Sequence, residues 1–321
     1  MFLGILSIAV VVLSGFAGAT IILPLMAFGP SLNHEIFWQL RLPRVLTAFL
    51  AGSGLALCGM VFQALFRNPL ADPFTLGTAS GASCGAALTI LAGISGSVLG
   101  IPVISIGAFI GAACAMGVVY GIASLKKASS GLTMLLAGIA VSFLFSSLLM
   151  FFQYISNFRD SFQIVRWLMG GIPAAGYNSV ISLLSFWTIG VVLIFMRLPS
   201  LDHLLAGEEL ARSRGVDVIA AKHWLLVAST LLIAGIVAVC GPIGFVGLMV
   251  PHMCRRLVSA NHIFIGPACL FLGGSFLAVA DTLGRTIIAP AEMPVGVLTA
   301  LLGGPFFLWL LFGKKRGVGE F

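Results

Sequence analysis

Charge is what this sequence of 321 residues has least of. Only 8% of its residues are Asp, Glu, Lys or Arg and 60% are apolar, whereas about a quarter of the residues of a soluble domain are charged. This composition excludes a soluble enzyme, a secreted disulfide scaffold and a disordered tail. It predicts an all-α integral membrane protein, because an α-helix satisfies its own backbone groups across a long apolar stretch.

Closely spaced cysteine pairs are absent as well. The six cysteines form no Cys-x-x-Cys pattern, and most lie in uncharged runs, where a thiol packs as a small apolar group. We therefore expect no disulfide, no metal site and no cofactor in this chain. The net charge of +7 comes from basic residues scattered between apolar runs. That pattern is typical of loops facing an anionic membrane surface and does not indicate a nucleic-acid partner.

Charges and Pro/Gly breaks divide the chain into ten predicted membrane spans within a single domain, residues 1–321. Residues 225–254 hold no charged residue over 30 positions, too long for one span of about 20 residues, so we divide them at Gly241-Pro242. The apolar run that starts at Met1 has no basic residues before it and is interpreted as a retained first span. The spans are residues 4–25, 45–66, 74–94, 98–124, 132–154, 180–196, 225–240, 242–254, 263–280 and 295–312.

Both termini are predicted to be cytoplasmic. An even number of spans places them on one side, and the basic residues Lys314-Lys315-Arg316 after the last span mark that side as the inside. Twelve of the seventeen basic residues are then inside, among them Arg67, Lys126, Lys127, Arg197, Arg212, Arg214, Lys222, Arg255 and Arg256. The five outside are Arg41, Arg44, Arg159, Arg166 and Arg285.

Glycines recur at helical spacing. The series Gly77-xxx-Gly81-xxx-Gly85, Gly107-xxx-Gly111 and Gly117-xxx-Gly121 place small residues on one face of a helix, which predicts close helix–helix packing. Residues 197–222 are the one long polar stretch and are predicted to be a cytoplasmic insertion, helical over 207–214. An insertion of this length is either a solvated connector or a docking surface.

The sequence has no phosphate-binding loop. Its only Gly-Lys pair, Gly313-Lys314, lacks both the upstream glycine and the following Ser or Thr, so this chain is not expected to hydrolyse ATP. An ion-coupled carrier would instead need titratable groups within the membrane, and the candidates are Asp281, His252 and Glu292. Asp281 precedes Arg285 by four residues, and an ion pair on one helix face is favoured over a proton relay.

Several polar motifs are more specific than any single glycine pattern. They are Arg41-Leu-Pro-Arg44, Arg67-Asn-Pro-Leu-Ala-Asp-Pro73, Leu136-Ala-Gly-Ile139, Trp167-Leu-Met-Gly170, Gly241-Pro-Ile-Gly-Phe-Val-Gly-Leu-Met-Val-Pro-His252 and Glu292-Met-Pro-Val-Gly296. With these motifs the sequence resembles, over essentially its full length, the FecCD-type permease family of ABC importers, which serve ferric siderophores, haem and cobalamin.

The resemblance implies a fold and a set of partners. It implies the ten-helix permease fold of type II ABC importers, in the cytoplasmic (inner) membrane of a prokaryote, working as a dimer with an identical or closely related subunit. Two separate ATPase subunits would bind ATP and Mg²⁺, and a periplasmic or lipid-anchored substrate-binding protein would deliver the substrate.

The resemblance also assigns roles at the outer face and at an inner gate. Arg41, Arg44 and Arg285 match arginines that receive acidic residues of the binding protein, and guanidinium groups suit this because they pair bidentately with carboxylates. The alternative for Arg41 and Arg44 is an anchor at the membrane surface, and Asp281 or Glu292 could instead occupy Arg285.

The cytoplasmic gate is assigned to the turn after the second predicted span. Asn68 and Leu70 match residues of this gate, with Gly131 and Leu132 on its opposite side, and the alternative is a simple connector made rigid by its two prolines. Spans 132–154 and 295–312 would line an apolar pathway.

The ATPase contact is assigned to the polar insertion, as a coupling segment at about residues 200–222. The residues matched are Gly207, Glu208, Glu209, Ala211, Arg214 and Gly215. Arg214 departs from the family pattern, which usually has Leu there, and implies a more polar contact. A solvated loop is the alternative, and His252 is interpreted as structural.

The sequence therefore predicts the transmembrane permease of an ABC importer for a bulky metal chelate, with a ferric siderophore placed ahead of haem and cobalamin. No catalytic residue is assigned to this chain. The alternatives are an ion-driven secondary carrier that uses Asp281 and a membrane scaffold that transports nothing.

Overall fold

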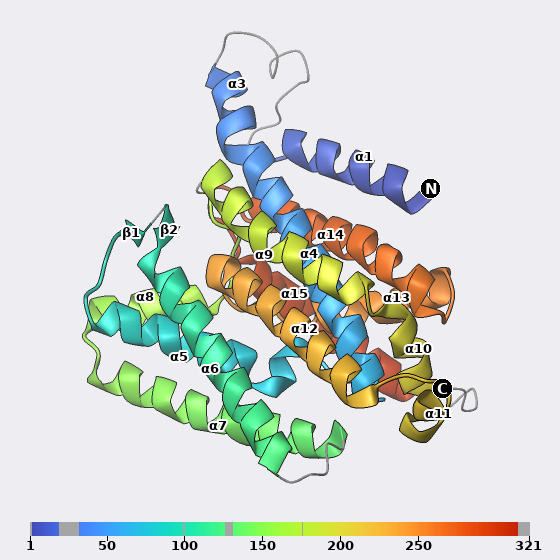
Figure 1. Cartoon of the computed structure of the whole chain (residues 1–321). Helices are drawn as coiled ribbons and strands as arrows, with labels where there is room; N and C mark the ends of the chain where they lie inside the picture. The colour runs from blue at the N-terminus through green and yellow to red at the C-terminus, as the bar shows by residue number, and fades with distance from the viewer. Residues whose placement is uncertain (1, 19–31, 99, 126–130, 175, 314–321) are drawn as a thin grey trace.

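The computed structural model describes residues 2–18, 32–98, 100–125, 131–174 and 176–313, which form a bundle of helices with one short hairpin (Figure 1). The first half holds α1 (Phe2–Phe16), α3 (Leu32–Glu35), η1 (Ile36–Arg41), α4 (Leu42–Leu65), η2 (Pro73–Leu76), α5 (Thr78–Leu91), β1 (Ser97–Val98), β2 (Ile101–Pro102) and α6 (Val103–Leu125). The second half holds α7 (Gly131–Ile155), α8 (Phe158–Leu168), α9 (Tyr177–Phe195), α10 (Leu198–Ala206), α11 (Glu208–Ser213), α12 (Val218–Cys240), α13 (Val246–Leu257), α14 (His262–Thr286) and α15 (Val295–Gly313). The strands β1 and β2 pair antiparallel, with Ser97 opposite Pro102.

The helical, membrane-spanning character expected from the composition is confirmed. Within the described ranges, six helical stretches are long and apolar enough to cross a membrane: residues 33–65, 103–122, 133–155, 177–195, 218–240 and 262–286. Three shorter apolar helices cover residues 3–16, 78–91 and 295–310. Each of the ten predicted spans overlaps one of the helices α1, α4, α5, α6, α7, α9, α12, α13, α14 or α15, but the count of ten spans stays a prediction.

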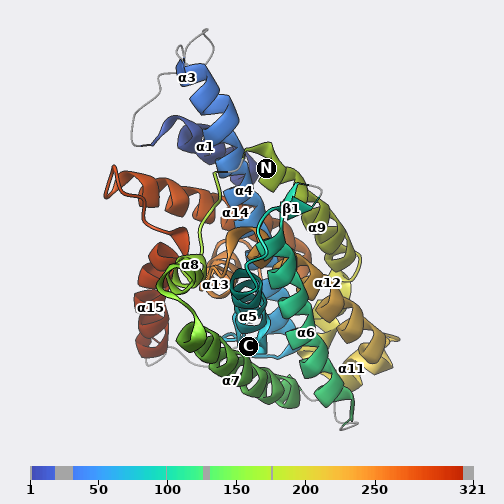
Figure 2. The same ribbon diagram turned by 90° about the vertical axis from the view of Figure 1, so that its left-hand side faces the viewer.

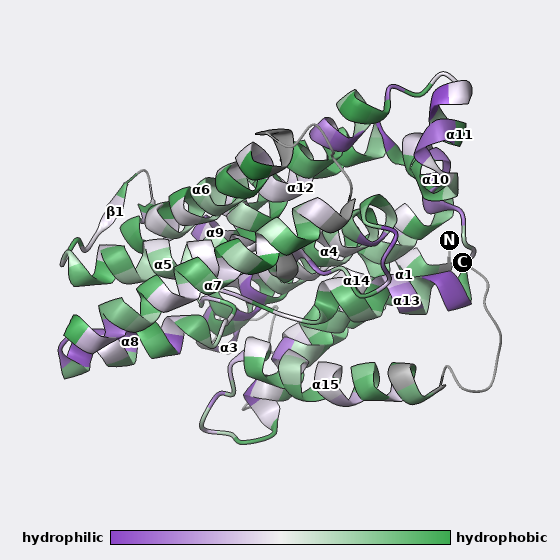
Figure 3. Ribbon diagram, turned by 90° about the horizontal axis from the view of Figure 1, so that it is seen from below, coloured by the Kyte–Doolittle hydropathy of each residue, from purple (hydrophilic) through white to green (hydrophobic). Residues whose placement is uncertain are grey.

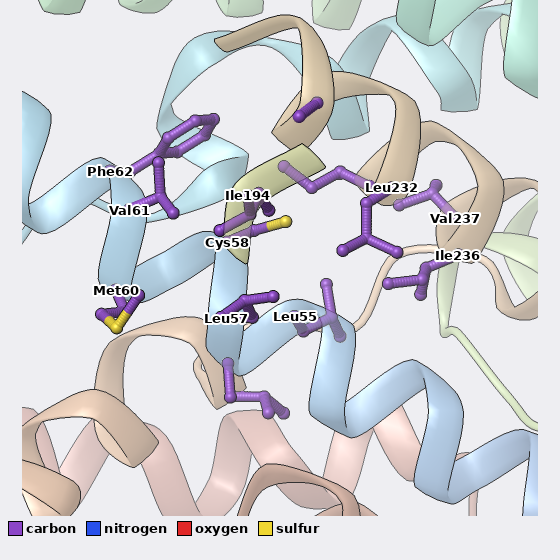
Figure 4. Close-up of a cluster of buried hydrophobic side chains, with 14 of the residues drawn as sticks. Leu55, Leu57, Cys58, Met60, Val61, Phe62, Ile194, Leu232, Ile236 and Val237 are labelled. Atoms are coloured by element: carbon purple, nitrogen blue, oxygen red, sulfur yellow. The ribbon is translucent and has the colours of Figure 1, made fainter. Parts of the chain in front are cut away.

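The helix α4 lies at the centre of the bundle. The long helices differ in how much of their most apolar window of 18 residues is buried. In the stretch 33–65, which contains α4, 83% of this window is buried, whereas in α7 only 17% is buried. Apolar side chains of α4 such as Leu55 and Leu57 join Leu232 and Ile236 of α12 in one buried cluster (Figure 4). Figure 2 shows α7 and α15 at the edge of the bundle.

Glycine pairs allow α4 to touch its neighbours backbone to backbone. A Cβ atom on Gly52 would lie 2.2 Å from the carbonyl oxygen of Gly273 on α14, and a Cβ atom on Gly59 would lie 1.8 Å from that of Gly247 on α13. Neither distance leaves room for a side chain, so these crossings require glycine.

The predicted glycine faces are confirmed for two of the three series. A Cβ atom on Gly81 of α5 would lie 2.5 Å from the carbonyl oxygen of Gly111 on α6. A Cβ atom on Gly85 would lie 2.1 Å from the carbonyl oxygen of Gly107 on the same helix. The prediction for Gly117-xxx-Gly121 is wrong within the described chain, because Cβ atoms there would meet no atom within 4 Å. Helical spacing alone does not show whether a second helix passes over a glycine face.

The polar elements separate to the two ends of the bundle. Figure 3 shows α10 and α11 at one end and β1 and α8 at the other. We call these the α10 end and the α8 end. The described basic residues predicted to be inside and outside follow the same division: Arg212 lies on α11, while Arg159 and Arg166 lie on α8. Lys126, Lys127 and Lys314-Lys315-Arg316 lie outside the described residues.

The break at Gly241-Pro242 is confirmed. The helix α12 ends at Cys240 and α13 begins at Val246, and the linking residues Gly241 and Phe245 both have φ of +68°. Gly171 donates its backbone N–H to the carbonyl oxygen of Cys240 at 2.8 Å, and Gly296 donates to that of Gly170 at 3.2 Å. Three of the motifs quoted above therefore meet at this break between α12 and α13.

The second predicted span, residues 45–66, is shorter than the helical stretch that the structure shows. The helical stretch begins near Asn33 rather than at residue 45, through a widened π-helical turn, η1, that precedes Pro43. Proline has no N–H to donate to the carbonyl of Gln39, four residues before it, which accounts for the irregular turn. The helix α8 and the hairpin were also not predicted as separate elements.

Candidate functional site

The arginines predicted to face outward lie together near the α8 end. Arg44 lies in the first turn of α4 and Asp281 lies near the end of α14, and the antiparallel packing of the two helices brings them together. The Arg44 Nε atom lies 3.2 and 3.1 Å from the two carboxylate oxygens of Asp281, and its Nη2 lies 3.1 Å from Oδ1. Its Nη1 donates to Glu292 Oε2 at 2.8 Å.

Arg285 completes this ion cluster. Its Nε atom lies 3.0 Å from Asp281 Oδ2, as the spacing of four residues predicts, and its Nη2 donates to the Thr282 hydroxyl at 3.1 Å. Asp281 is 3% exposed and lies between two guanidinium groups. Opposite charges on both sides offset the large cost of burying a carboxylate.

Arg41 has a different environment from the other two arginines. Its side chain is buried, its Nη1 donates to the backbone carbonyl of Phe16 at 3.0 Å, and it is close enough to Arg285 for the two charges to repel each other. With Arg41 included, the cluster has three guanidinium groups and two carboxylates. Its net positive charge suits an acidic partner, although much of its hydrogen-bonding capacity is already used within the chain.

The residues assigned to the gate lie at the α10 end, in the turn between α4 and η2. Asn68 accepts a hydrogen bond from the backbone N–H of Leu70 through its Oδ1 at 3.0 Å, and its carbonyl accepts one from Ala71 at 3.0 Å. These bonds and Pro69 hold the turn in one shape. We call residues 66–73 the gate turn.

The residues predicted to form the opposite side of the gate, Gly131 and Leu132, lie at the start of α7. This helix runs from Gly131 to Ile155. The helix passes over η2, where a Cβ atom on Gly77 would lie 3.1 Å from Val141 Cγ1. The structure therefore places α7 against the segment that follows the gate turn.

Asp72 connects the gate turn to the break between α12 and α13. Its carboxylate accepts hydrogen bonds from the backbone N–H groups of Phe74, at 3.5 Å, and Phe245. Burial raises the pKa of this carboxyl to about 6, and the two hydrogen bonds offset part of that shift because they stabilise the charged form.

Two further polar residues join α4 to α13 above the gate turn. Gln63 donates its amide to the carbonyl oxygens of Gly247 and Leu248 at 3.3 and 3.4 Å. Its Oε1 accepts a hydrogen bond from Arg255 Nη1 at 2.6 Å. Gln63 is 3% exposed, and its side-chain amide both donates and accepts hydrogen bonds. These bonds satisfy a buried polar group within an apolar core.

The segment assigned to ATPase coupling is helical at the α10 end. The expected helix over 207–214 is confirmed as α11, Glu208–Ser213, and it is separated from α10 by Gly207, whose φ is +137°. Ala211 is fully buried, while Glu209 is exposed. Lys222 on α12 pairs with Glu208 at 2.6 Å, and Arg214 Nη1 lies 3.3 Å from His203 Nδ1. Gly215 has φ of +81° and turns the chain toward α12.

Two contacts that the sequence does not signal attach α10 to the bundle. Arg67 of the gate turn donates Nε and Nη2 to the carbonyl oxygen of Leu204 at 3.1 and 2.9 Å. Asp202 Oδ1 lies 2.5 Å from His262 Nδ1 and accepts the backbone N–H of His262 at 3.2 Å. The partners are 137 and 60 residues apart in sequence, and no local spacing predicts such pairs.

The comparisons with known proteins agree with this architecture. A model of the FecCD transport family matches residues 1–313. The hemin transport system permease of Yersinia pestis is 39% identical over 283 residues, which cover 88% of this chain and 84% of that protein. The vitamin B12 import system permease of Citrobacter koseri is 35% identical over 318 residues, covering 98% and 94%.

A solved structure is similar over nearly the whole fold. It is reported as an inward-facing conformation of a metal-chelate type ABC transporter, with a TM-score of 0.87, 32% identity and coverage of 97% of both chains. The arrangement of helices described above is therefore shared with a transporter subunit along its full length.

Proposed function

The chain belongs to the FecCD transport family, and from this premise we propose that it is the membrane-spanning permease subunit of an ABC importer for a bulky metal chelate. The observation that carries the proposal is the similarity along the full chain to permeases for hemin and vitamin B12. Both of these substrates are metal ions held in a large organic ligand. A ferric siderophore, the chelate expected from the sequence, belongs to the same chemical class.

The energy would come from partner subunits. The sequence carries no phosphate-binding loop, so two ATPase chains would bind ATP and Mg²⁺ and act on the coupling segment at the α10 end. ATP can drive the transport cycle only if the complex binds it differently in its inward-open and outward-open states. The α10 end would then face the cytoplasm, with both termini on that side of the inner membrane.

The outer partner would be a substrate-binding protein. The cluster of Arg41, Arg44 and Arg285 at the opposite end has a net positive charge and would receive acidic side chains of that protein. A second permease subunit, identical to this one, would complete the pathway. The helices α7 and α15 lie at the edge of the bundle and expose large apolar side chains such as Phe143 and Leu301, which suits an apolar pathway or a subunit interface.

An ion-driven carrier based on Asp281 has less support. The carboxylate is held on both sides by Arg44 and Arg285 at 3.0–3.2 Å. These two arginines occupy the carboxylate within the chain, whereas a coupling group must take up and release an ion during each cycle.

The test is transport by the reconstituted complex. We expect chelate uptake into proteoliposomes to require the permease, its ATPase and its binding protein, and to stop when the ATPase is inactivated by mutation. Uptake driven by a proton or sodium gradient without the ATPase would establish the carrier instead. A scaffold would show no substrate-dependent stimulation of the ATPase. The chelate retained by the binding protein would distinguish siderophore, haem and cobalamin.

A further inference from the structure

Arg67 occupies an unusual position at the end of the central helix. It follows α4, its φ is +48°, and its side chain leaves the gate turn to reach α10. A left-handed conformation costs a residue with a side chain roughly 1 kcal/mol or more. The chain adopts it here within a turn in which Asn68 donates its N–H to the carbonyl oxygen of Gln63 at 3.2 Å.

The acceptor of Arg67 lies at the end of α10. The last carbonyl groups of a helix have no partner within it and carry the negative end of its dipole, so a guanidinium group is favoured there. Leu204 O receives two N–H groups from Arg67, and Gly207 also donates to it at 3.3 Å, where α10 ends and α11 begins. A charged donor with two hydrogen bonds to one carbonyl fixes the position of that helix end relative to the gate turn.

A second contact holds the same helix from the other side. Asp202 lies two residues before Leu204 and binds both the ring and the backbone N–H of His262, the first residue of α14. Because α14 packs along α4 through Gly52 and Gly273, α10 is attached to both members of the central helix pair. A displacement of α10 therefore acts on α4 and α14 together.

From these contacts, and resting on the proposed function, we propose that Arg67 is the positioning residue that transmits movement of the coupling segment to the gate turn. The connection from the coupling segment to the gate turn has three steps. The helix α11 is joined to α10 through Gly207, and Arg67 binds the carbonyl oxygen of Leu204 at the end of α10. Arg67 is followed directly by Asn68 in the gate turn. Leu70 then follows through the hydrogen bond from its N–H to Asn68 Oδ1. When this connection is lost, ATP hydrolysis should continue without moving the gate.

The first experiment measures chelate transported per ATP hydrolysed in proteoliposomes that contain the full complex. Arg67→Ala should lower this ratio about tenfold, the effect of one hydrogen bond to a charged group. Arg67→Lys keeps a charged donor but not the two-pronged geometry and should give an intermediate ratio. Arg197→Ala is the matched control, because Arg197 is an exposed arginine at the opposite end of α10 and should leave the ratio unchanged.

The second experiment measures the distance between the gate turn and α10 by pulsed electron spin resonance. Spin labels at Leu70→Cys and Leu205→Cys would be placed in a Cys114→Ser background, because Cys114 is the exposed cysteine among the six. With Arg67 present, the two labels should keep one distance between the nucleotide-free and ATP-bound complexes. With Arg67→Ala the distance distribution should broaden in at least one state.

A purely structural role for Arg67 would give a different result. It would lower the amount of assembled complex and leave the transport ratio of the surviving Arg67→Lys complex at the wild-type value, which would overturn the proposal. An unchanged ratio in Arg67→Ala, or an unchanged distance distribution, would overturn it as well. If the wild-type complex itself shows no ATP-driven uptake, the proposed function fails, and this outcome is distinct because it does not depend on any variant.

Discussion

Arg44 holds both oxygens of Asp281 across the crossing of α4 and α14, with its Nε atom 3.2 and 3.1 Å from them. Arg285 lies 3.0 Å from the same carboxylate. The pairing joins the two central helices at the end opposite to the coupling segment. It also means that two of the arginines assigned to docking have a structural role within the chain.

We first predict that Asp281→Asn strongly destabilises the permease. The substitution leaves two mostly buried guanidinium groups without their shared carboxylate, and breaking such a pair costs about 3 kcal/mol or more. Glu292→Gln is the control, because Glu292 is 56% exposed and its pair with Arg44 should contribute about 1 kcal/mol or less. Thermal unfolding of both variants in detergent measures the difference. Equal midpoints would show that the buried pair does not stabilise the fold.

The second prediction concerns docking of the binding protein. Arg44→Lys preserves the positive charge but loses the planar fork that pairs with a carboxylate, so affinity for the binding protein should fall about tenfold at low salt. Added salt should weaken wild-type binding because the contact is between charges. Arg166→Lys, an exposed position on α8, is the control. Undiminished affinity in Arg41→Lys, Arg44→Lys and Arg285→Lys alike would contradict the assigned role.

The third prediction tests the backbone contact between α4 and α13. In Gly59→Ala the new Cβ atom would lie 1.8 Å from the Gly247 carbonyl oxygen, so the helices must separate, at a cost of about 2 kcal/mol. Gly117→Ala places its Cβ atom in open space and should gain about 0.5 kcal/mol from better helix propensity. Thermal unfolding again provides the measurement. A Gly59→Ala protein that unfolds at or above the wild-type temperature would show that α13 is not fixed against α4.

The fourth prediction is a pH dependence from Asp72. Its pKa in the folded protein is about 6, above the usual value of about 4 for Asp, so the folded state binds the proton more tightly. The stability from this group is therefore complete below about pH 4 and is lost as the pH rises through 6. Relative to Asp72→Asn, the wild type should lose up to about 3 kcal/mol between pH 4 and pH 8.

Unfolding midpoints of the isolated permease across this pH range measure the effect of Asp72. The comparison uses Asp72→Asn, which keeps an oxygen to accept the N–H of Phe74, and Glu209→Gln, which alters an exposed carboxylate on α11. Only Asp72→Asn should change the slope against pH. Parallel curves for the wild type and Asp72→Asn would show that this carboxyl titrates normally.

Much of the architecture could be predicted because hydrophobicity and Pro/Gly breaks act locally. The break at Gly241-Pro242 follows from the length of one uncharged run, and the pair of Asp281 with Arg285 follows from a spacing of four residues on one helix. The glycine face of α5 and α6 also follows from helical spacing. In each of these cases the deciding interaction lies within one helix or between two adjacent ones.

The contacts between distant segments could not be predicted in this way. Nothing near Arg67 in the sequence indicates the carbonyl of Leu204, because a backbone acceptor has no residue type that marks it. The second partner of Asp281, Arg44, lies 237 residues away, and Gly117-xxx-Gly121 has the same spacing as the packed glycines, yet added Cβ atoms there would meet open space among the described residues. These outcomes depend on how the helices cross, which single-residue patterns do not encode.

The close crossing of α4 with α14 limits which motions this protein can make. A shift of one helix along the other by one turn, about 5.4 Å, would bring residues with side chains to the place where Gly52 and Gly273 now meet within van der Waals distance. The pair can therefore tilt or rotate as one rigid body but cannot slide internally. Under the proposed function, opening and closing would therefore have to occur by movements outside this helix pair, and a drug or antibody fragment that prevents those movements should arrest the transport cycle.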